Sequence, residues 1–300
     1  MILAPLRGVT IRCFRETFAD VIREAGFTEA VTPFIPAMQG VDPLKSEELR
    51  VKSEECLISS SLIPHPSSLR VTPQFIGKDP EALRACLERV KAAGYDTADL
   101  NCGCPFPMVR NKGRGSGLLR TPEVLRRMLE VGCAVMGEGK FSVKARLGVD
   151  RSDELLKMMP LINAFPLRFL TIHARTARQM YAGSCDVAMA EKVAEVAKVP
   201  IVFNGDVEFP LSEKRKGFRF PIMIGRSFIR WLGSRDDVAE LLERYVAASQ
   251  KELCGGRPVL GRMKELIAYW KELPQWKRRW NVLKLCRSID ELRSVVSAEI

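Results

Sequence analysis

Short apolar runs alternate with helical patterns along the first three quarters of the chain. Eight of these runs have the length and composition of buried strands. They span residues 2–4, 30–34, 73–76, 97–101, 141–146, 169–173, 201–204 and 222–224. This alternation predicts an α/β fold with a mostly parallel sheet covered by helices.

Helix start signals stand between several of the runs. Asp79 occupies a capping position ahead of Pro80 and an apolar stripe, and Gly94 ends that stripe. Thr121 and Pro122 repeat the arrangement before the next stripe. A capping residue followed by proline is typical of a helix N-terminus, so a helix is expected after each pair.

Eight strand–helix units in roughly the first 235 residues fit a (β/α)8 TIM barrel, which typically needs ~250. A doubly wound open sheet is the rival, since periodicity does not report closure. Five of the runs carry a polar residue near the C-terminal end: Gln74, Asn101, Lys144, His173 and Asn204. Polar groups on so many strand ends favour the barrel, whose active sites lie on that rim.

The pattern changes after Gly233 and Ser234. Helical runs begin at Asp236 and continue at about residues 258–272 and 275–298, with no convincing strand. We therefore expect a barrel over residues 1–233 followed by a small all-helical domain over residues 234–300.

Composition narrows the class of protein. The 300 residues are 46% hydrophobic and 28% charged, which is typical of a folded globular chain. No apolar stretch approaches the ~18 residues of a membrane span, and no signal peptide is visible, so a cytoplasmic protein is expected. Nine cysteines without paired spacing read as free thiols, and with only two histidines we expect no metal site.

The charge is strongly basic and unevenly placed. Lys and Arg number 47 against 36 Asp and Glu, a net charge of +11. Residues 251–287 hold ten Lys or Arg and three Glu, which supplies +7 of that excess. Such a concentration favours RNA as the partner, whereas the tryptophans of the same segment fit a small core better than a stacking surface.

A set of motifs appears in one order along residues 1–232. They are Ala4-Pro5 with Gly8-Val9-Thr10, Pro73-Gln74-Phe75-Ile76-Gly77, Asp99-Leu100-Asn101-Cys102-Gly103-Cys104-Pro105, Val143-Lys144-Ala145-Arg146-Leu147-Gly148, Ile172-His173-Ala174-Arg175-Thr176, Gln179 with Tyr181, Asn204-Gly205-Asp206, and Met223-Ile224-Gly225-Arg226. With these motifs the sequence resembles the tRNA-dihydrouridine synthase family, and the Asn-Cys-Gly-Cys-Pro variant is most similar to its bacterial C-type branch.

The resemblance implies reduction of tRNA uridines by FMN, with NADPH as the reductant and tRNA as the partner of a monomeric enzyme. It places the proton donor at Cys104. It places the cofactor against Ala4, Pro5, Gln74, Lys144, His173, Asn204, Gly205, Asp206, Gly225 and Arg226. Contacts to the uridine or to the rest of the tRNA are expected at Asn101, Arg110, Lys112, Arg114, Arg175, Arg178, Tyr181, Lys277, Arg278 and Arg279.

The chemistry of these residues agrees with the resemblance. Reducing the 5,6 double bond of uracil takes a hydride at C6 and a proton at C5. Cysteine has an ordinary pKa near ~8.5, so a thiol on the turn between Gly103 and Pro105 carries the proton at neutral pH. Lys144 facing into a barrel mouth needs an anionic partner, which the reduced flavin ring supplies.

Two departures from the family pattern stand out. The segment 208–221 is short for a seventh barrel helix, and an irregular connection covered by Phe209, Phe218 and Phe220 is expected there. Arg7 replaces the acidic or small residue usual at its position. Two other functions stay open: a non-catalytic tRNA-binding protein on the same scaffold, and a small-molecule FMN oxidoreductase. The sequence decides neither the uridine position nor the choice between NADPH and NADH.

Overall fold

The computed structural model describes residues 1–49, 69–212 and 219–298. Its strands all pair in parallel within one sheet, in the order β3-β5-β6-β7-β8-β9-β10-β1-β2-β4. They are β1 (Ile2–Leu3), β2 (Glu29–Val31), β3 (Ile35–Pro36), β4 (Arg70–Thr72), β5 (Gln74–Ile76), β6 (Ala98–Cys102), β7 (Phe141–Gly148), β8 (Leu170–Thr176), β9 (Ile201–Asn204) and β10 (Ile222–Ile224).

The sheet closes on itself because β3 and β4, the segments at its two ends, belong to two strands that lie next to each other. β2 and β3 are halves of one strand that is interrupted around Pro33, and β4 and β5 are halves of another that is interrupted at Pro73. β2 pairs with β4 and β3 pairs with β5, so the two halves of the first strand pair in parallel with the two halves of the second. Proline has no N–H for the ladder, which explains the breaks. Ten segments thus make eight strands of a closed barrel.

This closure confirms the TIM barrel and excludes the open doubly wound sheet. Neighbouring strands follow chain order, and β1 pairs with both β10 and β2. All eight expected runs contain a strand, although β7 and β8 continue two or three residues beyond the expected ends.

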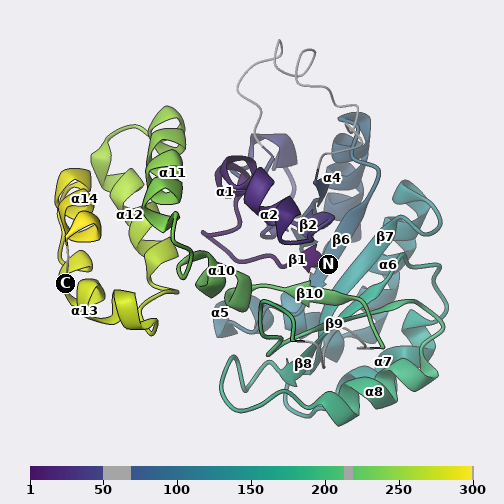
Figure 1. Ribbon diagram of the computed structural model, residues 1–300. Coiled ribbons are helices and arrows are strands. Elements are labelled where there is room, and N and C mark those ends of the chain that lie inside the picture. The colour runs from purple at the N-terminus through teal and green to yellow at the C-terminus, as the bar shows by residue number, and fades with distance from the viewer. Residues whose placement is uncertain (50–68, 213–218, 299–300) are drawn as a thin grey trace.

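Helices cover the outside of the barrel (Figure 1). They are α1 (Arg12–Thr17), α2 (Ala19–Glu24), α4 (Pro80–Ala92), α5 (Pro107–Arg110), α6 (Pro122–Met136), α7 (Glu154–Ile162), α8 (Val187–Val196) and α10 (Arg226–Leu232), with 3-10 turns η1 (Pro43–Lys45) and η2 (Gly115–Arg120). The side chain of Asp79 accepts from the N–H groups of Glu81 and Ala82, as expected of a cap. Thr121 makes no such bond, so the expectation of a second side-chain cap was wrong.

Four further helices lie to one side of the barrel, as Figure 1 shows. They are α11 (Val238–Glu252), α12 (Gly256–Ile267), α13 (Pro274–Leu283) and α14 (Ile289–Ser297). The single helical run expected over 275–298 is therefore two helices, and Cys286 between them is buried. The expected boundary at residues 233 and 234 falls in the turn between α10 and α11.

Two tryptophans join these helices to the barrel. The indole N–H of Trp270 donates to the carbonyl of Ile229 at 2.6 Å, and that of Trp276 donates to the carbonyl of Gly233 at 2.7 Å. The last carbonyls of a helix have no partner within the helix, so the indoles complete the C-terminus of α10. Both rings are about 1% exposed, which confirms that they belong to a core.

The connection between β9 and β10 is described only at its two ends. Residues 205–212 and 219–221 form no helix, and the remainder, including Phe218, lies outside the described residues. Phe209 packs against Phe27, Phe228 and Trp231, with ring centroids 5.1–5.7 Å apart. This aromatic cluster covers that side of the barrel.

Candidate active site

A cavity of about 750 Å³ opens at the carboxyl ends of the barrel strands. Gln74, Asn101, Cys104, Lys144 and His173, which come from four different strands or the turns after them, all line it. Glu265 and Tyr269, from α12 and the turn after it, also line this cavity. The C-terminal helices thus contribute to its wall, which the periodicity of the sequence did not indicate.

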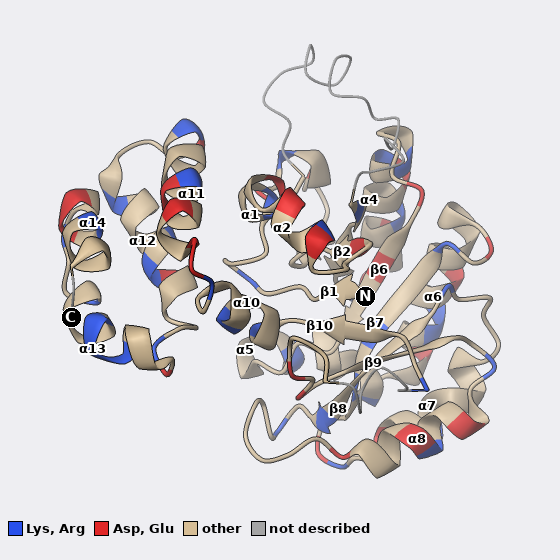
Figure 2. Ribbon diagram, viewed as in Figure 1, with Lys and Arg blue, Asp and Glu red and all other residues tan. Residues whose placement is uncertain are grey.

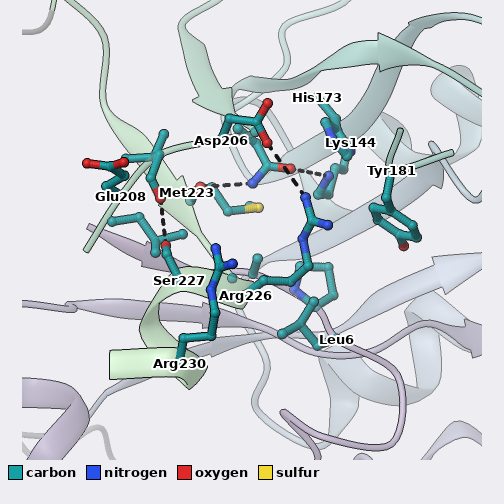
Figure 3. Close-up of a pocket in the computed structure, with 17 residues that line it drawn as sticks. Leu6, Lys144, His173, Tyr181, Asp206, Glu208, Met223, Arg226, Ser227 and Arg230 are labelled. Carbon is teal, nitrogen blue, oxygen red and sulfur yellow. Dashed lines mark hydrogen bonds and ion pairs between the residues drawn. The ribbon is translucent and has the colours of Figure 1, made fainter. Parts of the chain in front are cut away.

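A second hollow of about 250 Å³ adjoins the first (Figure 3). The two share Pro5, Leu6, Lys144, His173, Tyr181 and Arg226. The structure therefore brings all ten residues expected at the cofactor to one or both hollows, with Ala4, Asn204, Gly205, Asp206 and Gly225 lining the second.

Lys144 is a buried cation with a neutral partner. Its Nζ donates to Oδ1 of Asn204 at 2.9 Å, and Nδ2 of Asn204 donates to the carbonyl of Met223 at 2.9 Å. Burial and the nearby Arg146 lower the pKa of Lys144 to about 7, and Asp99 opposes that shift. An anion bound beside Lys144 would therefore stabilise the charged form of this side chain at neutral pH.

His173 has an unused hydrogen-bonding atom in the same place. Its Nε2 is buried without a partner among the described residues, and its ring lies 6.3 Å from that of Tyr181. Burial and the charges of Lys144 and Arg146 hold the pKa of His173 well below its usual value, so the ring is neutral. A buried polar atom without a partner indicates a missing ligand.

The second hollow is lined by glycine backbone and by side chains of both charges, the cations Lys144, Arg226 and Arg230 with the acids Asp206 and Glu208. In Figure 3, Arg226 and Arg230 of α10 face Lys144 and His173 across it. Gly205 has φ +119°, and a Cβ there would lie 2.6 Å from Sγ of Cys185. Only glycine fits this position, because a side chain would collide with Cys185 and with the His173 ring. These features suit a phosphorylated, partly anionic cofactor.

Cys104 lies in the turn that follows β6. Oδ1 of Asn101 accepts from the backbone N–H groups of Gly103 and Cys104, at 3.1 and 2.8 Å. The Cys104 carbonyl accepts from the hydroxyl of Ser116 at 2.8 Å, which fixes the other end of the turn. Burial raises the pKa of the Cys104 thiol, while Arg146 and Arg7 oppose that shift. The thiol is protonated at neutral pH.

Arg146 is a site residue to which the sequence reasoning gave no role. It is 2% exposed, and its Nε donates to the carbonyl of Gly103 at 2.9 Å. Its Nη1 donates to the carbonyls of Thr176 and Met180, at 3.0 and 2.7 Å. Arg146 thus connects the cysteine turn to the segment after β8. A charged residue inside a run of buried strand residues was the available signal. Arg230 was missed as well.

The residues expected at the tRNA are more dispersed. Arg110, Lys112 and Arg114 lie on α5 and the loop after it, and of these Lys112 is exposed. Lys277 and Arg278 are exposed on α13, whereas Arg279 is half-buried and donates to the Ala298 carbonyl at 2.7 Å. Figure 2 shows basic segments on α13, apart from those on the barrel.

Of the three residues expected at the RNA in and after β8, two are exposed and one is buried. The Tyr181 ring is 46% exposed beneath Arg226, 4.7 Å from its guanidinium carbon, and Arg178 is exposed with Asp150 as its ion-pair partner. Arg175 is 2% exposed and donates to Asp206 and to the carbonyl of Gly183, each at 2.5 Å. These acceptors turn Arg175 inward beneath the second hollow, and its contact with RNA stays a prediction.

Within the described residues, no group of three or more acidic, Cys or His side chains is placed to bind a metal ion. None of the described helices has both the length and the apolar character needed to cross a bilayer. All the cysteines outside the undescribed segments are free thiols.

Comparison with known proteins finds the same family by its sequence profile and by individual relatives. The sequence profile of the dihydrouridine synthase family matches residues 2–227. The tRNA-dihydrouridine(16) synthase of Salmonella typhimurium is 28% identical over 209 residues, which cover 69% of this chain and 64% of that protein. The match thus spans under two thirds of that relative's length. The protein of the same name from Haemophilus influenzae is 25% identical over 98% of this chain and 97% of its own.

Solved structures share the fold at low sequence identity. The old yellow enzyme homologue of Zymomonas mobilis has a TM-score of 0.54 and 13% identity, over 77% of this chain and 85% of its own. Morphinone reductase in complex with tetrahydroNAD has a TM-score of 0.52 and 11% identity, over 77% and 83%.

Proposed function

Because the chain belongs to the dihydrouridine synthase family, we propose that it is an oxidoreductase that reduces uridines of tRNA to 5,6-dihydrouridine. The observation that carries this proposal is the convergence of Cys104, Lys144 and His173 on one cavity at the barrel rim. A protonated thiol, a cation that lacks an anionic partner, and an unpartnered imidazole nitrogen are together suited to adding hydrogen across a polarised double bond.

FMN is the proposed cofactor. Lys144 and His173 would contact its ring, and Gly205, Gly225 and Arg226 would hold its phosphate in the second hollow. When bound and reduced by NADPH, FMN supplies the hydride that uracil C6 receives. Lys144 favours the negative charge of the reduced ring, because that charge restores the partner that its buried ammonium lacks.

Cys104 supplies the proton. Its Sγ holds a hydrogen at neutral pH, and transfer of that proton to C5 saturates the 5,6 bond together with the hydride at C6. Arg146 and Arg7 stabilise the thiolate that remains, since both lower the pKa of Cys104. A proton from solvent then restores the thiol.

The tRNA is the proposed partner of the basic areas. Lys112 on the loop after Cys104, with Lys277 and Arg278 on α13, would contact phosphates on two sides of the cavity. Uridine reduction inside the cavity requires the base to leave its stack. We propose a monomeric cytoplasmic enzyme similar to the C-type branch.

Replacing the thiol tests the proposal. Cys104→Ala should abolish dihydrouridine formation in unmodified tRNA, measured by nucleoside mass spectrometry, while flavin reduction by NADPH and tRNA binding persist. Cys102→Ala is the matched control, because this neighbouring thiol is buried outside the cavity and should not be needed. Full activity of Cys104→Ala would refute the assignment.

The same preparation separates the other functions. Protein that is colourless and cannot be reconstituted with FMN would indicate a tRNA-binding protein without catalysis. Protein that binds flavin and oxidises NADPH, yet leaves unmodified tRNA unreduced, would indicate an oxidoreductase of small molecules. Either result would overturn the proposed function.

A further inference from the structure

A chain of hydrogen bonds runs from the barrel interior to the cysteine turn. Oδ2 of Asp99 accepts from Nε2 of Gln74 at 2.7 Å, and Oε1 of Gln74 accepts from Nδ2 of Asn101 at 2.7 Å. Oδ1 of Asn101 then accepts from the N–H groups of Gly103 and Cys104. Asp99 and Gln74 are fully buried and Asn101 is 7% exposed, so water does not compete for these bonds.

The carboxylate decides which way both amides face. An ionised carboxylate only accepts, so Gln74 must turn its NH2 group toward Asp99 and its oxygen toward Asn101. Asn101 must in turn direct its NH2 group at Gln74, which leaves its oxygen for the cysteine turn. The orientation of the two amides follows from the chemistry of Asp99, even though oxygen and nitrogen have nearly the same shape.

This orientation also decides what Asn101 offers to a ligand. Both lone pairs of its oxygen are taken by Gly103 and Cys104, and one hydrogen of its NH2 group is taken by Gln74. The hydrogen that remains makes Asn101 a donor only toward the cavity that it lines. If Cys104 protonates uracil C5, the nearest polar group of the base is O4 on the adjoining carbon. O4 is an acceptor in uracil, whereas cytosine carries a donor there.

We propose that Asp99 is a positioning residue that acts through Gln74: it holds the cysteine turn and makes Asn101 a donor for the uracil O4 carbonyl. The selectivity part of this inference rests on the proposed function, whereas the positioning part does not. Asp99 touches no ligand itself, since it does not line either hollow.

The surroundings of Asp99 are compatible with an ionised group. Its other oxygen accepts from the hydroxyl of Ser142 at 2.6 Å. Burial and the charge of Glu29 raise the pKa of Asp99 to about 6, while Ser142, Gln74 and Lys144 oppose the shift. The group is therefore ionised at pH 7.5, where the experiment is carried out.

Reversing the polarity of the chain tests the proposal. In Asn101→Asp, two carboxylates flank Gln74, so one oxygen must face another whichever way the amide turns. Adding Asp99→Asn removes the conflict, because Gln74 can turn over, accept from the new NH2 group at position 99 and donate to the carboxylate at position 101. Net charge and side-chain shape stay the same as in the wild type.

Three properties are measured for the wild type, Asn101→Asp, Asp99→Asn and the double variant. Asn101→Asp should lower Tm by roughly 3–6 °C and change the alkylation rate of Cys104 about tenfold at its high-pH plateau, and the double variant should restore both. The rate of dihydrouridine formation should be about 10²-fold or more below that of the wild type in both Asn101→Asp and the double variant, because a carboxylate at position 101 has no hydrogen to donate. Ser142→Ala, which removes the donor to the other oxygen of Asp99, is the control and should change the rates less than about threefold.

Each contrary result has its own meaning. If the double variant is no more stable than Asn101→Asp, the polarity of the chain is not set by Asp99. If the double variant regains uridine reduction, Asn101 is not the donor to the base. If wild-type flavoprotein reduces no tRNA uridine, the proposed function fails, while the Tm and alkylation cycle still tests the positioning role.

Discussion

Lys144 shows how a single residue is adapted to an anion that the protein alone does not provide. Its ammonium is buried at the barrel rim and has the neutral oxygen of Asn204 as partner. The cost of burying a charge lowers its pKa to about 7, so about half of the side chains are neutral at pH 7 in the free protein. An anion at the site shifts that balance toward the charged form.

This residue predicts a pH dependence for binding of reduced FMN. Below pH 7 Lys144 is charged before and after binding, so this residue adds no pH dependence there. Above pH 7 binding must take up a proton, so the affinity should fall as pH rises, by up to about tenfold per pH unit. Anaerobic titrations from pH 6 to 9 measure this effect. Lys144→Met should bind more weakly without this slope, and an equal slope in that variant would contradict the assignment.

Other site residues show why single positions were harder to read than motifs. Arg175 and Arg178 are three residues apart, yet one is buried against Asp206 and the other is exposed beside Asp150. Both look alike in a basic segment. Which of them is buried depends on acceptors supplied by the segments after β9 and β7, and the sequence near the arginines does not indicate these acceptors.

At the scale of elements, α10 is the joint between the barrel and the C-terminal helices. Its last carbonyls receive the indole N–H groups of Trp270 and Trp276, whose ring centroids lie 4.8 Å apart. A Cβ on Gly233 would come within 2.4 Å of the Trp270 ring, so glycine is needed for this contact. Arg244 adds an ion pair from α11 to Asp20 on α2, at 2.9 Å.

This joint predicts one cooperative unit. Trp276→Phe keeps an aromatic ring but removes the shorter of the two bonds to the Gly233 carbonyl and leaves only the one from Nε2 of Gln275 at 3.2 Å, so it should destabilise the protein by about 1–3 kcal/mol. Calorimetry should record a fall in Tm of roughly 2–6 °C for the whole chain. Trp280→Phe, at a half-buried ring of the same helix, is the control and should change Tm less. A separate low-temperature transition in Trp276→Phe would mean that the helices unfold independently.

The elements themselves were largely predictable. Hydrophobic runs located all eight strands, because burial on both faces of a barrel strand requires continuous apolar sequence. The same reasoning joined α13 and α14 into one helix, since both stripes are amphipathic and no glycine or proline separates them. The turn between them is held by Lys264, which donates to the carbonyls of Lys284 and Cys286, at 2.9 and 2.6 Å, a contact from another helix.

At the scale of the whole molecule, the net charge of +11 is concentrated in two places. Residues 106–121, after Cys104, hold four Lys or Arg and no acid, and residues 251–287 hold ten Lys or Arg against three Glu. Since Glu265 and Tyr269 bring those helices to the cavity wall, one RNA could contact both areas while a base enters the cavity.

The charge distribution predicts a salt-dependent affinity for tRNA. Lys277→Glu with Arg278→Glu should weaken binding and reduce the slope of log K against log salt by about 1–2, because each phosphate contact releases counterions. Lys192→Glu with Lys198→Glu changes the net charge equally on the α8 side of the barrel and is the matched control. Filter binding at several salt concentrations measures both. Equal losses in the two pairs would indicate that net charge alone matters.

The sequence by itself determined the eight strands and most of the helices between them, the cysteine turn and the basic C-terminal segment, whereas closure of the sheet came from the strand pairing. These features depend on hydrophobic periodicity, on neighbouring residues and on composition, which are properties of short segments of the chain. The tertiary structure alone decided that Arg146 binds the Gly103 carbonyl, that Arg175 turns toward Asp206, and that Asp99 reaches Cys104 through Gln74. Most of these partners lie far apart in the chain, and only closure of the barrel brings their side chains within hydrogen-bonding distance.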